Sequence, residues 1–402
     1  MNKTILVIGS GKYQLSALKK IKKLRYYLIA VDGDKNSPGK EIADKFLNID
    51  IKDTKKILLA LQKEKIDIDY CMCFATELAL RTVAQINKAF NLPGLTKQMV
   101  DIATNKFLQR EIQKEIGLPY PKFFVSHKGD NILQKARKTK VAYPVIVKPV
   151  DNSGSRGVYI SYNEKDLLRN SRQSIKFSSF DQNIVVEEFI PGIEFTIESL
   201  INNNHIYHLA ISEKRKPVNN FTVSTELFYN SPLVERLRPK IESQLTKFFK
   251  KCNFNNTVTH TEMLYSFKDH LLYIVETTVR AGGFGIFDKI TPKVSGLDVV
   301  SLTISSLMGE KASIPVIQQN SCVLRFFTGN KGTVKNISIS NDIIKNVKDS
   351  EYGLFVKEGD VVGELKDDGS RLGYILAFGQ NWKQAFERAN QIEYAVKFEI
   401  CP

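Results

Sequence analysis

The sequence contains few cysteines and no long apolar run. Its five cysteines are odd in number, scattered along the chain, and include no Cys-x-x-Cys spacing. They therefore support neither a disulfide framework nor a zinc site. No stretch approaches the roughly 18 apolar residues of a membrane helix. The apolar run near the N-terminus, Ile5–Ile8, is too short for a signal peptide. We expect a protein of the reducing cytoplasm with no membrane partner.

Length and charge limit the possible domain organisation and the possible partners of the protein. The chain has 402 residues, of which 43% are apolar and 25% are charged. This length exceeds what one hydrophobic core usually supports, so we expect more than one domain. The net charge is +15, but acidic residues are interleaved with the lysines and no basic run carries aromatic residues. The charge therefore favours a lysine-rich surface that attracts anionic substrates, and it argues against a nucleic-acid partner.

The pattern of apolar residues changes along the chain. Residues 1–100 alternate short apolar runs with helical patterns, which predicts a parallel α/β domain. A helical stretch at 97–116 follows, and then closely spaced strands of α+β type. We expect a two-lobed domain over residues 101–312, with a small lobe at about 120–190. Glycine-punctuated short strands predict a strand-rich lobe over residues 313–402. The fold class is thus α/β and α+β multidomain.

The first glycine cluster half-matches a dinucleotide-binding fingerprint. Gly9 and Gly11 follow a strand and open a helix, and Asp32 ends the next strand. Gln14 stands where the fingerprint requires a third glycine. An NAD-binding oxidoreductase is therefore a remote alternative, and a glycine turn in a substrate-binding α/β domain is the interpretation that we favour.

A lysine ends an apolar strand in the middle of the chain. Residues 143–149 read Tyr-Pro-Val-Ile-Val-Lys-Pro, and Lys148 is the only charged residue among them. An apolar strand gains nothing structural from a terminal ammonium, but a lysine there can reach phosphate oxygens as a point charge. A loop of small residues follows directly, and its backbone N–H groups can turn towards an anion. Its candidate residues are Ser153, Gly154, Ser155 and Gly157.

Acidic residues end the strands that follow. Residues 185–194 carry two adjacent acids at a strand end and a third beyond a Pro-Gly turn. Backbone groups at such an end can read an adenine edge, and a carboxylate suits ribose hydroxyls. The candidates are Glu187, Glu188, Phe189, Ile190 and Glu194.

The sharpest signal is a pair of glutamates on neighbouring strands. Glu262 begins one predicted strand and Glu276 ends the next, so an antiparallel pairing can place both on one face. Two close carboxylates repel unless a cation lies between them, and oxygen ligands suit Mg²⁺. Arg280 follows on the same face and can clamp a carboxylate or phosphate with two hydrogen bonds.

In this order, the motifs resemble the ATP-grasp superfamily, and in particular its carboxylate–amine ligase branch, which includes L-amino-acid ligases. The segments around Arg325 and Lys357 are similar to the C-terminal lobe of that branch. The resemblance implies that Lys106 and Lys148 hold ATP phosphates under the Ser153–Gly157 loop. It implies adenine contacts at residues 187–190 and a ribose contact at Glu194.

The same resemblance assigns the remaining roles. Glu262 and Glu276 would coordinate Mg²⁺ or Mn²⁺, with Thr278 at a position where the family usually has asparagine. Arg280 would act at the acyl-phosphate. Candidate substrate contacts are His260, Gly282 and Gly283, although a structural role for His260 is the alternative. The implied reaction joins a small-molecule carboxylate to an amine at the expense of ATP, and the family is compatible with a homodimer. An ATP-grasp carboxylase or a formate-using ligase is the alternative reaction.

Overall fold

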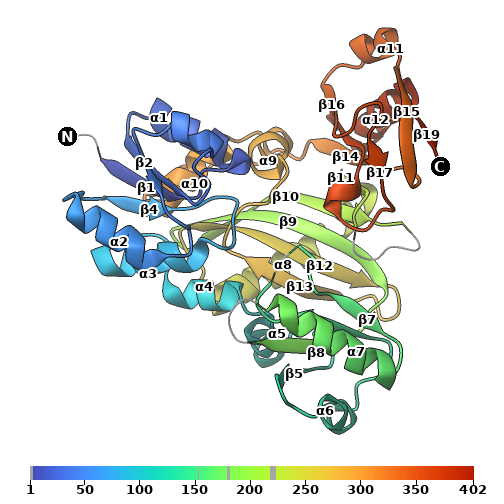
Figure 1. Ribbon diagram of the computed structural model, residues 1–402, viewed down its shortest axis with the longest axis horizontal. Helices are drawn as coiled ribbons and strands as arrows, with labels where there is room; N and C mark the ends of the chain where they lie inside the picture. The colour runs from blue at the N-terminus through green and yellow to red at the C-terminus, as the bar shows by residue number, and fades with distance from the viewer. Residues whose placement is uncertain (1–2, 153, 179–181, 218–222) are drawn as a thin grey trace.

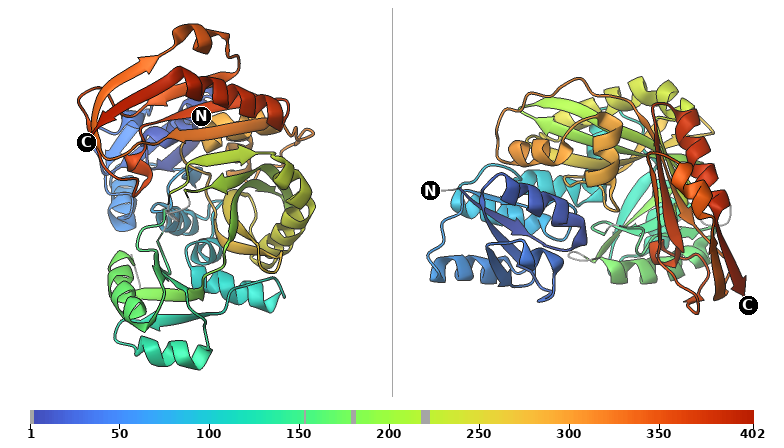
Figure 2. Two further views of the ribbon diagram at one scale, coloured as in Figure 1. Left: turned by 90° about the vertical axis from the view of Figure 1, so that its right-hand side faces the viewer. Right: turned by 90° about the horizontal axis from the view of Figure 1, so that it is seen from above.

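The computed structural model describes residues 3–152, 154–178, 182–217 and 223–402. Two ends of the molecule are formed by the N-terminal domain and the C-terminal lobe, and the small lobe projects from one side (Figure 1). Figure 2 shows the small lobe well separated from the C-terminal lobe in the left-hand view. No helix of the described residues is long and apolar enough to cross a bilayer.

The N-terminal domain is a parallel α/β sheet, as predicted. Its strand order is β3-β2-β1-β4, and every pairing is parallel. The sequence pattern missed β3 and α2, and β4 is shorter than the apolar run at 66–74 suggested. The elements are β1 (Thr4–Ile8), α1 (Leu15–Lys23), β2 (Tyr27–Asp32), β3 (Lys45–Asn48), α2 (Thr54–Lys63), β4 (Tyr70–Met72) and α3 (Leu80–Phe90).

Two helices connect this domain to the small lobe, where the sequence pattern predicted one. They are α4 (Lys97–Ala103) and α5 (Lys106–Glu115). The prediction of a continuous helix is wrong because Asn105 adopts an extended backbone, with φ −137° and ψ 100°. Its side-chain oxygen accepts a hydrogen bond from the Leu108 N–H and caps α5. This break places Lys106 in the first turn of a new helix.

The small lobe is a four-stranded antiparallel sheet in the order β5-β8-β6-β7. Two helices that the sequence pattern did not reveal pack on it and close a small apolar core around Val145, Val147 and Leu167. The elements are β5 (Phe123–His127), α6 (Ile132–Thr139), β6 (Val145–Pro149), β7 (Tyr159–Ser161), α7 (Glu164–Ser174) and β8 (Asn183–Glu188).

An eight-stranded antiparallel sheet forms the body of the molecule, in the order β13-β12-β9-β10-β11-β14-β18-β16. It runs without a break across position 312, where the sequence suggested a domain boundary, so the boundaries remain predictions. Its first part comprises β9 (Gly192–Asn202), β10 (His205–Arg215), β11 (Glu226–Tyr229), β12 (Thr257–Ser266) and β13 (Leu272–Thr278). Helices α8 (Pro232–Lys251), α9 (Thr291–Ser295) and α10 (Val299–Leu307) accompany these strands.

The C-terminal lobe extends this sheet and adds a second one. The strands β14 (Ser321–Phe327), β16 (Ser350–Leu354) and β18 (Gly373–Gly379) continue the large sheet. The second sheet has the order β17-β15-β19 and comprises β15 (Gly332–Ile339), β17 (Val361–Val362) and β19 (Val396–Cys401). Helices α11 (Asn341–Asn346) and α12 (Trp382–Ala395) belong to the same lobe.

Candidate active site

The two predicted metal glutamates face each other across an antiparallel pair of strands. Glu262 on β12 is the register partner of Glu276 on β13, and His260 is the partner of Thr278. Directly opposed residues of such a pair lie on the same face of the sheet. The structure therefore brings Glu262, Glu276, Thr278 and His260 to one face at the edge of the large sheet.

Each of these glutamates is paired with a lysine. The Lys106 ammonium lies 2.8 Å from a carboxylate oxygen of Glu276. Lys214, on β10, donates to Glu262. Burial raises the pKa of Glu262, but Lys214 and His260 outweigh this effect and lower the pKa to about 2. Both lysines are thus positioned by carboxylates that the sequence predicted as metal ligands.

Lys106 also connects the large sheet with the small lobe. Its ammonium donates to the carbonyl of Asn152, at the start of the Gly/Ser loop of the small lobe. Burial alone would lower the pKa of Lys106, but Glu276 and Glu77 raise it. Lys106 therefore carries a full charge while buried, at the point where β13 meets the loop after β6.

The lysine strand of the small lobe ends in a buried charge network. Lys148 is 5% exposed, and its ammonium lies 2.7 Å from an oxygen of Glu187. Arg110 contacts Glu187 from the other side, with Nε 2.8 Å from Oε1. Burial raises the pKa of Glu187, but Arg110 and Lys148 hold it near 2. Burial lowers the pKa of Lys148, and the Glu187 carboxylate only partly offsets this.

This network fixes the side chain of Glu187. The sequence predicts backbone contacts to adenine at this strand end, and the Glu187 carboxylate is engaged by Lys148 and Arg110. Any contact between Glu187 and a base would have to use the backbone. Its carboxylate instead supports the phosphate-binding candidate Lys148. Arg110 was missed altogether, and its only sequence signal is its position four residues after Lys106 on one face of α5.

The Gly/Ser loop adopts left-handed backbone conformations. Gly154, Ser155 and Gly157 have φ values of 67°, 56° and 78°. A Cβ at Gly157 would also approach the Cβ of Phe177 to 2.8 Å. Both the positive φ and the lack of space therefore favour glycine at this position. Ser153 lies outside the described residues. The role of the loop over phosphates remains a prediction.

The segment after β8 lies between the lobes. The backbone N–H groups of Glu188 and Phe189 donate to the carbonyls of Lys122 and Pro144, both at 3.0 Å. Ile190 follows and is partly exposed. Glu194, on β9, is paired with Lys216 and lies 3.5 Å from Lys214. The adenine and ribose contacts of these residues remain predictions.

Arg280 lies where the large sheet meets the N-terminal domain. The N–H of Ala281 donates to the carbonyl of Phe74 at 3.0 Å, which holds the strand end against the loop after β4. Glu77, from this loop, lies 3.5 Å from Arg280. Burial raises the pKa of Glu77, and Arg280 only partly opposes this. Glu77 was missed in the sequence, although ligand sites in parallel sheets cluster at the carboxyl ends of strands such as β4.

His260 is fixed by a buried carboxylate. Its Nδ1 is hydrogen-bonded to Glu198, which also accepts the Gly282 N–H at 3.1 Å. A Cβ at Gly282 would lie 2.9 Å from the Glu198 oxygen and 3.1 Å from the His260 Nδ1. Gly283 has open space around it. Gly282 thus allows the close approach of Glu198 and His260, and a substrate contact at the two glycines remains a prediction.

The N-terminal glycine cluster does not support a nicotinamide site. The Gln14 amide lies 2.2 Å from where a Cβ at Gly9 would stand, so the side chain fills the turn. The Asp32 carboxylate accepts from the N–H groups of Ser10 and Asp34, at 2.8 and 3.0 Å, and is committed to its own loop. A cavity of about 260 Å³ remains between this loop and Thr76, next to Glu77.

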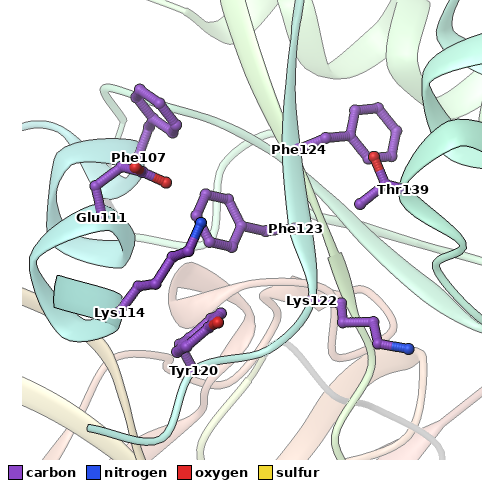
Figure 3. Close-up of a pocket in the computed structure, with 8 residues that line it drawn as sticks. All are labelled: Phe107, Glu111, Lys114, Tyr120, Lys122, Phe123, Phe124 and Thr139. Atoms are coloured by element: carbon purple, nitrogen blue, oxygen red, sulfur yellow. The ribbon is translucent and has the colours of Figure 1, made fainter. Parts of the chain in front are cut away.

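A second cavity, of about 280 Å³, lies on the small-lobe side of α5 (Figure 3). Its rim is aromatic, with the rings of Phe107 and Tyr120 packed edge-on against Phe123. None of the predicted site residues lines it.

The carboxylate pair fits a hard divalent cation. Glu262 and Glu276 offer oxygen atoms on one face. The buried hydroxyl of Thr278, beside them on β13, has no hydrogen-bond partner in the described part of the chain. The described residues contain no group of three or more His, Cys, Asp or Glu that could hold an ion. The donor set therefore suits Mg²⁺, which commonly uses one or two carboxylates and takes its other ligands from phosphate and water.

Two family models match this chain. Residues 141–288 match the family model "ATP-grasp domain", and residues 325–400 match "L-amino acid ligase C-terminal domain 2". An uncharacterized protein of Sinorhizobium fredii is 20% identical over 82% of this chain and 68% of its own length. The D-alanine–D-alanine ligase of Wolbachia pipientis is 27% identical over 45% of this chain and 56% of its own length.

Solved structures share the whole fold. The L-amino acid ligase of Bacillus licheniformis has a TM-score of 0.83 at 20% identity, covering 100% of this chain and 99% of its own. A biotin carboxylase domain from Hydrogenobacter thermophilus, solved with MgADP, has a TM-score of 0.75 at 17% identity, with coverages of 100% and 91%. The family uses ATP or ADP, generally with Mg²⁺.

The fold and these matches are those of the ATP-dependent carboxylate–amine ligases. The chain contains an ATP-grasp domain, and it carries the C-terminal domain of the L-amino acid ligases.

Proposed function

We propose that this chain phosphorylates a small-molecule carboxylate with ATP and joins the acyl-phosphate to an amine, releasing ADP and phosphate. The observation that carries the proposal is the position of Lys106. Its ammonium contacts both Glu276 of the carboxylate pair and the carbonyl of Asn152 beside the Gly/Ser loop. One cation thus joins the phosphate-binding and metal-binding candidates into a single centre.

The residues present suit this chemistry. Lys106 and Lys148 would hold the ATP phosphates, and Glu262, Glu276 and Thr278 would hold Mg²⁺. The bound ion would offset charge on the phosphoryl oxygens. No side-chain nucleophile is needed. The nearby thiol of Cys73 is unsuited to such a role, because burial raises its pKa to about 12.

The substrate side would be formed by Arg280 and Glu77. A guanidinium can bind the substrate carboxylate and the acyl-phosphate that replaces it. The buried Glu77 carboxylate beside it would favour a cationic amine. In the first step a carboxylate oxygen attacks the γ-phosphorus and ADP leaves. In the second step the amine first gives up one proton to become neutral, and its nitrogen then attacks the acyl carbon. Phosphate leaves, and the nitrogen gives up a second proton as the amide forms.

The setting of the enzyme is part of the proposal. Four of the five cysteines are buried, and all five are unpaired. Unpaired thiols and a requirement for ATP both fit the cytoplasm. The partners would be small molecules, and a homodimer is the expected assembly, which light scattering on the purified chain would test.

Phosphate release from ATP, screened over pairs of carboxylic and amino acids, tests the proposal directly. We expect release that requires both substrates, and mass spectrometry should identify an amide product. Release that requires bicarbonate or formate in place of a larger acid would favour the carboxylase or formate-using alternative. Glu276→Gln should abolish release without unfolding the protein. Glu351 is a partly exposed glutamate of the C-terminal lobe, and Glu351→Gln should not change release. Wild-type activity in Glu276→Gln would overturn the assigned centre.

A further inference from the structure

Helix α5 has an unusual buried face. The helix is amphipathic, but every residue that it buries is polar or charged: Lys106, Gln109, Arg110 and Gln113. Its other side carries Phe107, Glu111 and Lys114, which line the aromatic cavity (Figure 3). The buried stripe of a helix is normally apolar, because polar groups cost free energy to bury unless they are hydrogen-bonded. The partners of these buried groups therefore explain why the face is polar.

Gln109 and Arg110, two of these buried residues, bind the backbone of β13. This strand is at the edge of the large sheet, so its outer N–H and C=O groups have no neighbouring strand. The Gln109 amide donates to the Thr277 carbonyl at 2.8 Å and accepts the Thr277 N–H at 2.9 Å. Arg110 donates to the carbonyls of Ile274 and Val275, at 2.9 and 2.7 Å.

These contacts enclose Glu276. The backbone of the residue before it is held by Arg110, and that of the residue after it by Gln109. Lys106, one turn earlier on the same face of α5, contacts the Glu276 carboxylate itself. Successive turns of one helix therefore fix both the backbone and the side chain of a predicted metal ligand.

Arg110 reaches the small lobe as well. It is 1% exposed and contacts both oxygens of Glu187, with Nε at 2.8 Å and Nη2 at 3.4 Å. Glu187 in turn holds Lys148 at 2.7 Å. One guanidinium thus connects the phosphate-binding candidate of the small lobe with the metal-binding strand of the large sheet.

We propose that Gln109 and Arg110 are positioning residues, which set Glu276 and Lys148 at a fixed separation for one nucleotide–metal complex. The inference rests on the proposed function, because it assumes that these two side chains bind the same ligand. Arg110 acts on both partners, and Gln109 acts on β13 alone. A planar guanidinium can serve a carboxylate and two carbonyls at once, which an ammonium cannot do in the same geometry.

Binding of ADP, measured by calorimetry with and without Mg²⁺, separates the two residues. Arg110→Met should weaken ADP binding in both conditions, because Glu187, the partner of Lys148, is no longer held in place. Gln109→Met should weaken only the binding that depends on Mg²⁺, because β13 alone is released. Losses of about 10–100-fold are typical when an outer hydrogen bond to a ligating side chain is removed. Arg110→Lys should restore part of the affinity that is measured without Mg²⁺.

The C-terminal lobe offers a matched control. Arg325 is also a buried arginine that is paired with two glutamates, Glu226 and Glu393, but it lies on β14. Arg325→Met should lower thermal stability without changing ADP affinity below the melting temperature. An equal loss of affinity in Arg325→Met and Arg110→Met would reduce the role of Arg110 to general stability and overturn the inference.

A double-mutant cycle gives the decisive readout. If Arg110 acts through Lys148, the variant carrying both Arg110→Met and Lys148→Met should bind ADP without Mg²⁺ no more weakly than Lys148→Met alone. Additive losses would overturn the inference. If Arg110→Met does not fold, Arg110→Lys in the same cycle and Gln109→Met carry the test. If ADP affinity is unchanged in all folded variants, the inference is overturned and the proposed function stands. If the wild-type chain does not bind ADP at all, the proposed function is overturned as well.

Discussion

Replacing Glu187 with glutamine should destabilise the protein strongly, and in a way that depends on pH. The substitution keeps the shape of the side chain but removes the charge between Arg110 and Lys148, which are both buried. Two cations then face each other in a medium that solvates them poorly. Breaking a buried ion pair by removing one partner costs about 3–5 kcal/mol.

The pKa of Glu187 gives an independent magnitude. The two cations lower it from 4.5 to about 2, and one pKa unit is worth about 1.4 kcal/mol, so the native state gains about 3 kcal/mol from the charged form. Because the pKa is lower in the folded state, this stability is complete above pH 4.5 and is lost as the pH falls towards 2. The glutamine variant has no such group to titrate.

Urea unfolding at a series of pH values measures the difference. At pH 7 the free energy of unfolding of Glu187→Gln should lie about 3 kcal/mol below that of the wild type. The difference should shrink as the pH falls below 4.5. Other carboxyl groups titrate in both proteins and cancel. The neighbouring Glu188, which is half-buried and 3.8 Å from an exposed Lys122, is the control, and Glu188→Gln should cost less than about 1 kcal/mol. A difference that stays constant with pH would refute the reasoning.

Three further outcomes follow from the site. Gly282→Ala should lower kcat about 10–100-fold with little change in melting temperature, because the methyl group would push Glu198 away from His260; unchanged turnover would contradict this role. Gly192→Ala should instead lower the melting temperature in thermal unfolding, because its Cβ would stand 2.2 Å from the Tyr265 carbonyl, and a variant as stable as the wild type would contradict so close an approach of the two backbones. Glu77→Gln should remove an acidic limb from the pH profile of kcat/KM, because burial raises the pKa of Glu77 and its charge is lost on acidification; a profile identical to wild type would exclude Glu77 from the substrate site.

The strand pairing at the centre of the site could be predicted from sequence. Glu262 and Glu276 stand on either side of a short turn, which predicts that their strands pair. Their exact opposition depends on a register shift between Glu262 and Met263, which the sequence did not reveal. Lys148 was visible for a related reason, because a charge at the end of an apolar strand is conspicuous. Local patterns of this kind extend over a few residues, and the fold confirms the class of structure that they predicted.

The partners of these residues could not be predicted in the same way. Arg110 and Glu187 are 77 positions apart, and Gln109 and Thr277 are 168 apart. Neither contact leaves a local signal, because it depends on how the lobes pack. The buried network around Glu187 was hidden in the same way, because it depends on Arg110 from a distant part of the chain. The break at Asn105 was hidden by a local signal rather than by a missing one. The apolar residues keep helical spacing on both sides of Asn105, and only the capping side chain of Asn105 marks the start of a second helix.

Pairing within the chain explains how so much charge can be buried at this centre. Lys106 is matched with Glu276, Lys148 with Glu187, and Lys214 with Glu262. Each lysine is therefore compensated by a carboxylate, which avoids the large cost of an isolated buried ion. Entry of a nucleotide with a divalent cation would exchange the partners in two of these pairs, with Lys106 turning to phosphate and Glu262 and Glu276 to the cation. Since positive and negative groups would enter together, the exchange would keep the centre close to neutral. Glu187 would keep its place beside Lys148, because Arg110 holds it, so Lys148 would meet the ligand from a fixed position.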